Sequence, residues 1–206
     1  LSALLLPFGK LGDRIGKRRI FKWGTGTFVL GSLMAGINLG FNFLMLGRMV
    51  QALGGAMTLA NTYGIVTSTF ALAERGRAMG VVSTFVALGG VAGPSLGGLI
   101  LAHFSWPMIF LINVPIGLIA LGISFWSMDN GRPQPGAYDG GGMVLQATAI
   151  ASGFWELNLA QQSGFGDPLV LATFALAVIS LMAFLGFERH QSTPLLPMSI
   201  FRVRIF

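Results

Sequence analysis

Residues 78–128 read AMGVVSTFVALGGVAGPSLGGLILAHFSWPMIFLINVPIGLIALGISFWSM and contain no Asp, Glu, Lys or Arg. As one helix this stretch would be roughly 75 Å long, about twice the length that a bilayer needs. It therefore predicts two membrane-spanning helices joined by a turn. We expect the turn at residues 103–107, HFSWP, because proline interrupts helices and tryptophan favours the membrane interface.

The whole chain has the composition of a membrane protein. Of its 206 residues, 53% are hydrophobic and 10% are charged, whereas an average soluble domain carries about 25% charged residues. This composition excludes a disordered chain and an ordinary soluble enzyme. There is no cysteine, and the two histidines, His103 and His190, stand alone, so the sequence predicts no metal site.

The charged residues divide the rest of the chain into further apolar runs of membrane-spanning length. These uncharged or nearly uncharged runs lie at residues 23–47, 49–73, 140–161 and 168–187. The chain begins within an apolar stretch, residues 1–8, and ends in RVRIF at residues 202–206, and we expect both to be cut ends of further helices. The expected fold is an all-α, polytopic membrane bundle with about six complete helices and two cut ends.

The basic residues lie on one side of this expected topology. If the segment at residues 9–22 is cytoplasmic, every Lys and Arg except Arg48 falls on the cytoplasmic side, and the outer loops near residues 41–43, 103–107 and 161–167 have none. This asymmetry is the positive-inside pattern of multi-pass proteins of the cytoplasmic membrane. It explains the net charge of +6 by membrane orientation, so we expect no nucleic-acid partner.

Arg48 is the exception, because it lies inside a span. An arginine at mid-membrane costs about 2.5–3.5 kcal/mol on insertion scales and usually faces a cavity or a partner; the alternative is that it snorkels to the outer interface. Gln51 follows one turn later on the same face. Glu156, toward the outer end of residues 140–161, is either a titratable acid or an interfacial glutamate. We take Arg48 and Gln51 as a candidate functional pair and Glu156 as a candidate for proton coupling or cation recognition; the family resemblance described below implies a proton-coupling role for this set.

Small residues recur every four positions in the span before the expected turn. The two rows are Gly89, Gly93 and Gly97, and Gly90, Pro94 and Gly98. Adjacent rows of small residues make a flat helix face that permits very close helix contact, and the proline allows a kink. We interpret this face as a tight packing surface, with a role in gating as an added hypothesis.

Residues 9–19, GKLGDRIGKRR, are expected to form a short turn between two helices. Asp13 is expected to cap the following segment or to accept hydrogen bonds from an arginine; the alternative is a solvated cluster of basic residues. The stretch differs from a P-loop, because three residues separate Gly12 from Gly16 and no Ser or Thr follows Lys17. With no other catalytic pattern present, we expect no enzyme.

Three motifs, taken together, resemble the major facilitator superfamily. Residues 9–19 resemble its signature loop between helices two and three, with Gly12 where alanine is frequent. Residues 48–56, RMVQALGGA, resemble its fourth-helix motif, and residues 80–98 resemble its fifth-helix antiporter motif. Residues 106–117, WPMIFLINVPIG, and 139–145, DGGGMVL, resemble stretches of the fourteen-helix drug:proton antiporters, although Pro107 and Met108 depart from that pattern.

The resemblance implies an organisation for the chain. Residues 1–127 would be the remainder of an N-terminal helical bundle, residues 128–139 a cytoplasmic linker, residues 140–187 an extra helix pair, and residues 188–206 a loop with the start of the next helix. One of the two bundles that alternating access requires would be absent. We therefore do not expect this chain to transport by itself.

The resemblance also implies a function, namely proton-coupled efflux of hydrophobic or cationic drugs, with no cofactor besides the proton gradient. Its partners would be small hydrophobic substrates, protons and membrane lipid. In the family, the loop motif locks the two halves of the protein together on the cytoplasmic side, and the fourth-helix arginine is associated with proton coupling. The fifth-helix motif serves the sealing and movement of helices against each other. The residues implied in gating are Gly9, Asp13, Arg14, Gly16, Arg18, Gly89, Gly93, Pro94, Gly97 and Gly98. The alternatives are an exporter of another small solute and a non-transporting membrane receptor or assembly protein.

Overall fold

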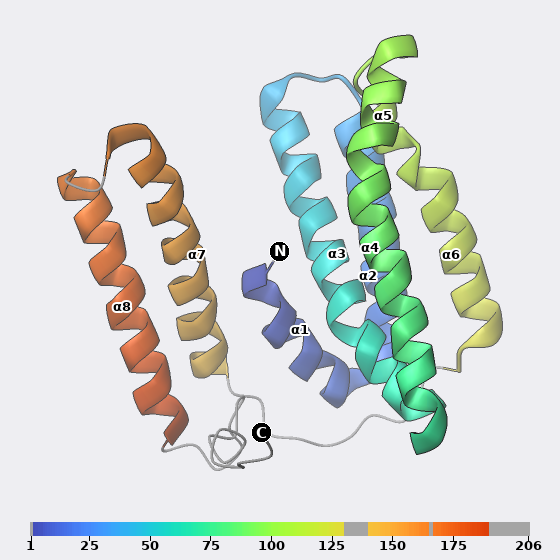
Figure 1. The fold of residues 1–206 in the computed structure, drawn as a ribbon, viewed down its shortest axis with the longest axis horizontal. Helices are drawn as coiled ribbons and strands as arrows, with labels where there is room; N and C mark the ends of the chain where they lie inside the picture. Colours follow the sequence, from blue (N-terminus) through green and yellow to red (C-terminus); the bar gives the residue numbers. More distant parts are fainter. Residues whose placement is uncertain (1, 130–139, 165–166, 190–206) are drawn as a thin grey trace. The chain divides into compact units, whose positions relative to one another are not determined.

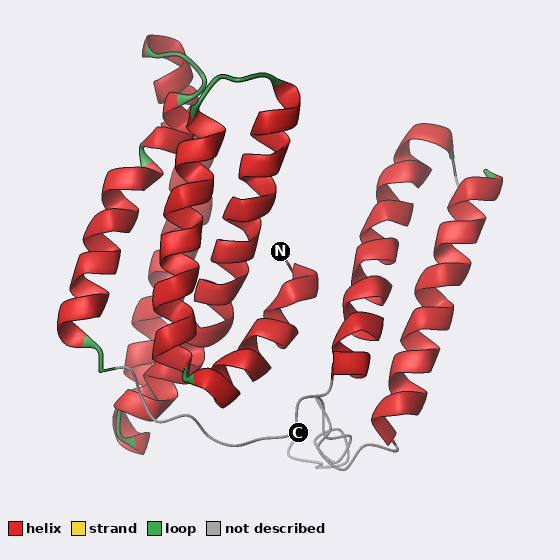
Figure 2. Cartoon of the chain, turned by 180° about the vertical axis from the view of Figure 1, so that it is seen from behind, coloured by secondary structure: helices red, strands yellow, loops and turns green. Residues whose placement is uncertain are grey.

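The computed structural model describes residues 2–129, 140–164 and 167–189, and within these ranges every regular element is a helix. Figure 1 shows them coloured in chain order, and Figure 2 shows short loops between helices of the first part of the chain, α2 to α6. The helices are α1 (Ser2–Ile15), α2 (Lys17–Gly36), α3 (Phe41–Thr69), α4 (Leu72–His103), α5 (Met108–Leu111), α6 (Asn113–Ser127), α7 (Gly140–Ser163) and α8 (Pro168–Arg189). The expected all-α fold is confirmed.

The chain divides into two compact units, which we describe separately. The first comprises residues 11–134 and contains α2 to α6, and the second comprises residues 2–10 and 135–206 and contains α7 and α8. The expected linker at residues 128–139 lies outside the described residues except for its first two positions, as do Asp139, Arg132 and the expected loop and helix start at residues 190–206. The predicted domain boundaries therefore stay predictions.

Glycines allow α2 and α3 to pack closely in the first unit. A Cβ atom built on any of three of these glycines would overlap the backbone of the facing helix. The facing pairs are Gly31 with Gln51, Gly47 with Ala35, and Gly54 with Phe28. Because van der Waals packing rather than the hydrophobic effect holds helices together in lipid, such close approach is a main source of stability.

The expected turn at residues 9–19 is wrong, because Gly16 alone separates α1 from α2. Gly16 has a φ of 116°, which glycine adopts easily and other residues do not. Its N–H donates to the Gly12 carbonyl at 2.9 Å, and its own carbonyl accepts from the N–H groups of Arg19 and Ile20 at 3.0 and 3.1 Å. The helical hydrogen bonds are thus interrupted for a single residue, which leaves few backbone groups without a partner.

Most other helix ends lie near their expected positions. The turn at residues 103–107 is confirmed, since α4 ends at His103 and α5 begins at Met108. The outer turn expected near residues 41–43 lies slightly earlier, between Gly36 and Phe41, where Gly40 has a φ of 95°. The charged residues at positions 74–77 fall within the start of α4 rather than in a loop.

Within the described residues, four helical segments are long and apolar enough to cross a membrane: Phe41–Thr69, Leu72–His103, Met108–Ser127 and Pro168–Phe187. Two of the six expected spans, α2 and α7, do not reach that composition. The first turns of α2 carry Lys17, Arg18, Arg19 and Lys22, and α7 contains Glu156 with several amides. These two helices therefore depend on their neighbours to shield polar groups.

Lys22 shows such shielding, because it is buried in α2 rather than exposed in a loop, with 6% of its surface accessible. Its Nζ donates to the carbonyl of Met128 at 2.6 Å and lies 4.9 Å from the centroid of the Phe125 ring. Met128 is the C-cap of α6, where carbonyl groups lack helical partners and the helix dipole favours a positive charge. Lys22 thus ties α2 to the end of α6.

In the second unit, apolar side chains hold α7 and α8 side by side (Figure 1). Met143 and Phe184 are 5% and 3% exposed and form a small core, against which Leu6, Leu145 and Leu185 pack. The two helices contact each other along the chain order α7 then α8, as in a helical hairpin.

Candidate functional site

Arg48 is hydrogen-bonded to Gln51, as their spacing on α3 predicts. Its Nη1 donates to Gln51 Oε1 at 2.6 Å, and Gln51 Nε2 donates in turn to Ser32 Oγ of α2 at 2.8 Å. Gln51 and Ser32 are 5% and 0% exposed. Arg48 thus stands at the end of a buried polar chain that crosses from α2 to α3.

An aromatic ring supports the guanidinium from another element. The Arg48 Cζ atom lies 5.4 Å from the centroid of Phe110 in α5, within the range of a cation–π contact. Trp106 meets Phe110 edge to face, with ring centroids 6.3 Å apart and an interplanar angle of 82°. Arg48 itself is exposed at the edge of the α2–α3 pair, so part of its guanidinium remains available to a further group.

Glu156 lies on α7 in the second unit and is half-buried. Among the described residues its carboxylate has no ion-pair partner within 4 Å. Because it belongs to a different compact unit from Arg48 and Gln51, its place in proton coupling stays a prediction.

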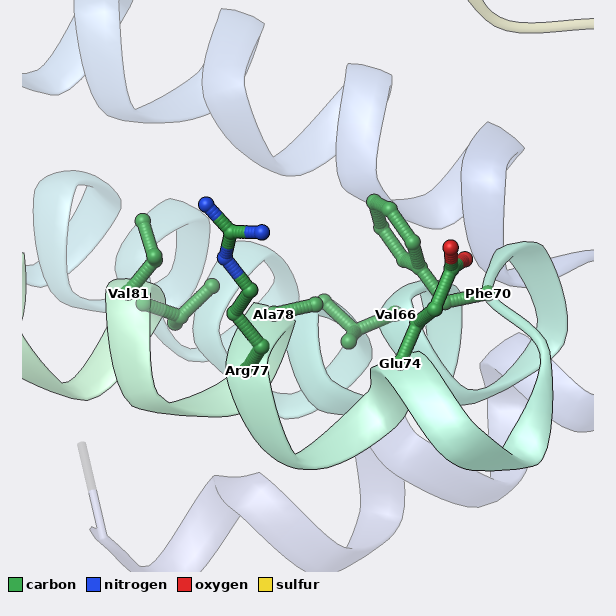
Figure 3. Close-up of a pocket in the computed structure, with 7 residues that line it drawn as sticks. Val66, Phe70, Glu74, Arg77, Ala78 and Val81 are labelled. Carbon is green, nitrogen blue, oxygen red and sulfur yellow. The ribbon is translucent and has the colours of Figure 1, made fainter.

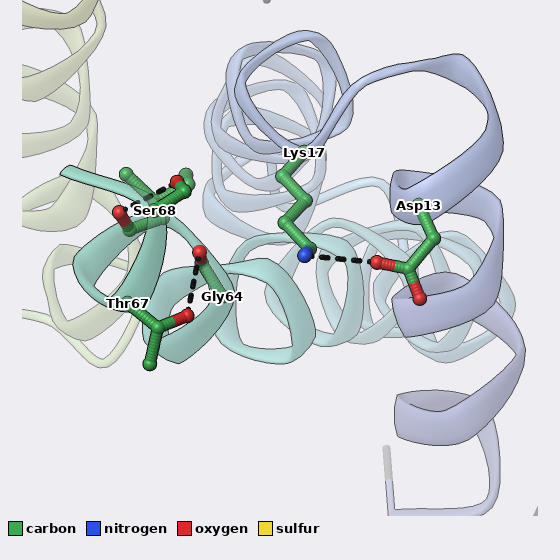
Figure 4. A network of polar contacts seen from close by, with 6 residues as sticks. Asp13, Lys17, Gly64, Thr67 and Ser68 are labelled. Carbon is green, nitrogen blue, oxygen red and sulfur yellow. Dashed lines mark hydrogen bonds and ion pairs between the residues drawn. The ribbon is translucent and has the colours of Figure 1, made fainter. Parts of the chain in front are cut away.

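At the other end of the first unit, Asp13 pairs with Lys17 rather than with an arginine (Figure 4). The Asp13 Oδ1 to Lys17 Nζ distance is 2.9 Å, and it spans the break at Gly16. The stem of Lys17 also contacts Gly64 of α3, since a Cβ on Gly64 would lie 2.7 Å from Lys17 Cδ and Cε. One lysine thus links α1, α2 and α3. The helix cap expected from Asp13 is absent, because the N-cap of α2 is Gly16 without a side-chain bond.

Two further contacts join the loop motif to α3. Arg18 Nη2 donates to Thr69 Oγ1 at 3.3 Å. The side chain of Asn61 occupies the space that a Cβ on Gly12 would take. Asn61 is 1% exposed, and its Nδ2 donates to the Met57 carbonyl at 2.9 Å. Glycine in place of the family's frequent alanine at position 12 therefore has a steric cause.

Gly9 and Arg14 complete the set implied in cytoplasmic gating. A Cβ on Gly9 would meet no other atom within 4 Å, and Arg14 lies in the last turn of α1. The structure brings Asp13, Gly16 and Arg18 together near the end of α3, but the gating role of the whole set stays a prediction.

The small-residue face of α4 has no packing partner among the described residues. A Cβ on Gly89, Gly90, Gly93, Gly97 or Gly98 would meet no other atom within 4 Å. No residue of α4 is buried, and the helix continues through Pro94. The tight contact predicted for this face is therefore not made within the described part of the chain, and its gating role stays a prediction.

A pocket of about 430 Å³ opens between the end of α3 and the start of α4 (Figure 3). It is lined by Val66, Phe70, Glu74, Arg77, Ala78, Val81 and Val82. Figure 3 shows the Glu74 carboxylate beside Phe70 and the Arg77 guanidinium farther along α4. None of the predicted site residues lines this pocket, so it is separate from the Arg48 cluster.

The sequence interpretation missed Ser32 and Phe110 as partners of Arg48. Ser32 is one of many small residues in its helix and carries no distinguishing signal. Phe110 lies in the stretch WPMIFLINVPIG, whose resemblance pointed to a family branch but not to a contact with Arg48. Among the described residues, no group of three or more His, Asp or Glu side chains is placed to hold a metal ion.

Comparison with known proteins agrees with the motifs. The sequence model of the Major Facilitator Superfamily matches residues 1–201. The chain belongs to the Major Facilitator Superfamily. Membership makes it part of a multi-pass membrane protein from a family of transporters, not of enzymes.

Several relatives within the superfamily are named for resistance or transport. The chain is 35% identical over 200 residues to the riboflavin transporter RibZ of Clostridioides difficile, covering 96% of this chain and 43% of RibZ. It is 33% identical over 204 residues to the tetracenomycin C resistance and export protein of Streptomyces glaucescens, covering 98% of this chain and 38% of that protein. It is 31% identical over 208 residues to the multidrug efflux pump LfrA of Mycolicibacterium smegmatis, covering 100% of this chain and 41% of LfrA. The chain thus spans less than half the length of these facilitators.

Proposed function

We propose that this chain is part of a proton-coupled exporter of hydrophobic or cationic compounds, which works by alternating access in the cytoplasmic membrane. The observation that carries the proposal is the placement of Arg48, a permanent cation within the apolar helix α3, on a buried polar chain and an aromatic ring. A charge that is costly in a membrane span usually marks a transport or coupling site. The names of two relatives, an export protein and an efflux pump, point the same way.

Arg48 supplies a fixed positive charge but does not carry the proton, because a guanidinium does not deprotonate in proteins. A nearby cation favours the ionised form of a carboxylate. In the proposed cycle, an acid binds either a proton or the cationic substrate, and binding of one releases the other. The proposed proton carrier is Glu156 or an acid outside this chain.

The cytoplasmic contacts have a separate role in the proposal. Lys17 and Arg18 link the ends of α1, α2 and α3 through Asp13, Gly64 and Thr69. These contacts hold the three helix ends as one block, which is the kind of rigid element that alternating access moves. The open small-residue face of α4 is the proposed sliding surface of the same block.

The test uses the full-length parent protein in inverted membrane vesicles with an acid interior. In this orientation an antiporter moves protons out of the vesicle and a fluorescent cationic dye into it. We expect dye uptake that requires the gradient and stops when a protonophore is added. Absence of uptake, with the protein shown to be inserted and folded, would count against proton-coupled drug export.

A second candidate function is transport of a polar heterocyclic solute, which the similarity to a protein named as a riboflavin transporter favours. The same vesicles distinguish the two candidates. Flavin uptake measured by its own fluorescence, with no dye uptake, would support the second candidate. Dye uptake that excess riboflavin does not reduce would support drug export.

A further inference from the structure

The buried chain behind Arg48 uses both ends of the Gln51 amide. The oxygen accepts from Arg48 at 2.6 Å, and the nitrogen donates to Ser32 Oγ at 2.8 Å. Ser32 is fully buried, so removing its hydroxyl takes this partner away from the Gln51 Nε2 donor in a buried site. An unpaired buried donor costs free energy, which favours other orientations of Gln51 over the one that faces Arg48.

The close approach of the two backbones keeps this chain short. Gly31 precedes Ser32 in α2, and a Cβ on Gly31 would lie 2.6 Å from Gln51 Cα. Only a residue without a side chain allows this approach. The distance that Gln51 must span to reach Ser32 is therefore set by the packing of α2 against α3.

The Phe110 ring that contacts Arg48 is also held in place by packing. The ring of Phe110 contacts Arg48 on one side and the edge of Trp106 on another. The next residue, Leu111, lies where a Cβ on Gly36 of α2 would be, at 2.5 Å from Leu111 Cδ2. This contact seats α5 against the end of α2 and leaves little freedom to the ring beneath the guanidinium.

We infer that Ser32 and Phe110 are positioning residues for Arg48: Ser32 acts through Gln51, and Phe110 acts through its ring face. The inference rests on the proposed function of Arg48 in proton coupling. A guanidinium has five N–H donors; Arg48 uses one of them on Gln51 and remains exposed, so other donors are available to a further group. An arginine held this way meets an incoming carboxylate without first having to be ordered, which reduces the entropic cost of that contact.

The first test compares Ser32→Ala with Ser124→Ala in the full-length parent. Ser124 is a matched control, since it is 2% exposed and its hydroxyl donates to the Leu121 carbonyl of its own helix. We expect Ser32→Ala to reduce gradient-driven dye uptake roughly three- to tenfold while dye binding without a gradient keeps the wild-type Kd. Ser124→Ala should retain wild-type uptake.

The second test removes and then restores the ring. Phe110→Leu keeps an apolar side chain but has no aromatic face, whereas Phe110→Tyr keeps the face. We expect Phe110→Leu to lower gradient-driven uptake and Phe110→Tyr to retain it. Equal uptake by the two variants would overturn the role of the ring.

The third test asks whether Ser32 acts through Gln51. Its readout is independent of transport. In purified protein, Ser32→Ala and Gln51→Leu should each lower the melting temperature, and the double variant should melt no lower than Gln51→Leu alone. Additive losses in melting temperature would overturn the inference.

The uptake measurements separate failure of this inference from failure of the proposed function. Wild-type uptake that does not depend on the proton gradient would overturn the proposed function and, with it, this inference. Gradient-driven wild-type uptake that Ser32→Ala matches would overturn this inference alone.

Discussion

Replacing Gly31 by alanine should separate α2 from α3 and disconnect Arg48. The new Cβ would lie 2.6 Å from Gln51 Cα and closer still to Gln51 N, whereas ordinary contact begins at 3.4 Å, so the helices must separate by at least about 0.8 Å. The same displacement would lengthen the 2.8 Å bond from Gln51 to Ser32 to about 3.6 Å, which is no longer a hydrogen bond. Forcing an extra carbon into a packed interface costs about 1–3 kcal/mol.

Gly26 supplies the control for this change, because it lies on the same helix and a Cβ there would meet no other atom within 4 Å. Both substitutions bring the same gain in helix propensity, up to about 1 kcal/mol, so the comparison isolates the steric cost. We expect Gly31→Ala to melt below Gly26→Ala in purified full-length protein and to lose gradient-driven uptake, while Gly26→Ala retains both. Equal melting temperatures for the two variants would refute the packing of α2 against α3 on which the Arg48 cluster depends.

Three further substitutions test other contacts by thermal melting of the purified full-length protein. Gly12→Ala should lower the melting temperature because the new methyl group meets Asn61, and adding Asn61→Ala should recover part of the loss; no recovery would contradict that contact. Lys17→Ala should change the free energy of unfolding by less than about 1 kcal/mol, and less still in high salt, because its pair with Asp13 is exposed; a large loss that salt does not reduce would contradict this. Lys22→Met should cost about 1–3 kcal/mol because the carbonyl at the end of α6 loses a buried donor; an unchanged melting temperature would contradict the cap.

The sequence predicts the helices well where a residue type restricts the backbone. Trp106 and Pro107 locate the turn between α4 and α5 because proline ends a helix and tryptophan marks the interface. The same reasoning fails at residues 9–19. There the glycines and charges predict a short turn, but one glycine with a φ of 116° is enough to separate two helices.

Packing faces are harder to predict, because small residues show that close contact is possible but not which neighbour makes it. The four-residue spacing in α4 indicated the tightest packing face, yet Gly89, Gly93 and Gly97 have no neighbour in the described part of the chain. The glycines that do pack, such as Gly47 and Gly54, recur after seven residues, two helical turns apart.

In the candidate site, too, the sequence predicts contacts within one helix but not contacts between helices. Arg48 and Gln51 lie one turn apart, so local spacing predicts their contact. Ser32 is 19 residues from Gln51 in the chain, and Phe110 belongs to another helix. Such contacts depend on how α2, α3 and α5 pack, which local periodicity does not encode.

Dye uptake by Arg48→Ala shows whether Arg48 couples substrate export to the proton gradient. The measurement uses acid-interior inverted vesicles that contain equal amounts of inserted wild-type or variant full-length protein. We predict gradient-dependent uptake by the wild type, its loss on adding a protonophore, and no gradient-dependent uptake by Arg48→Ala. Uptake by Arg48→Ala at the wild-type rate and with the same dependence on the gradient would contradict the claim.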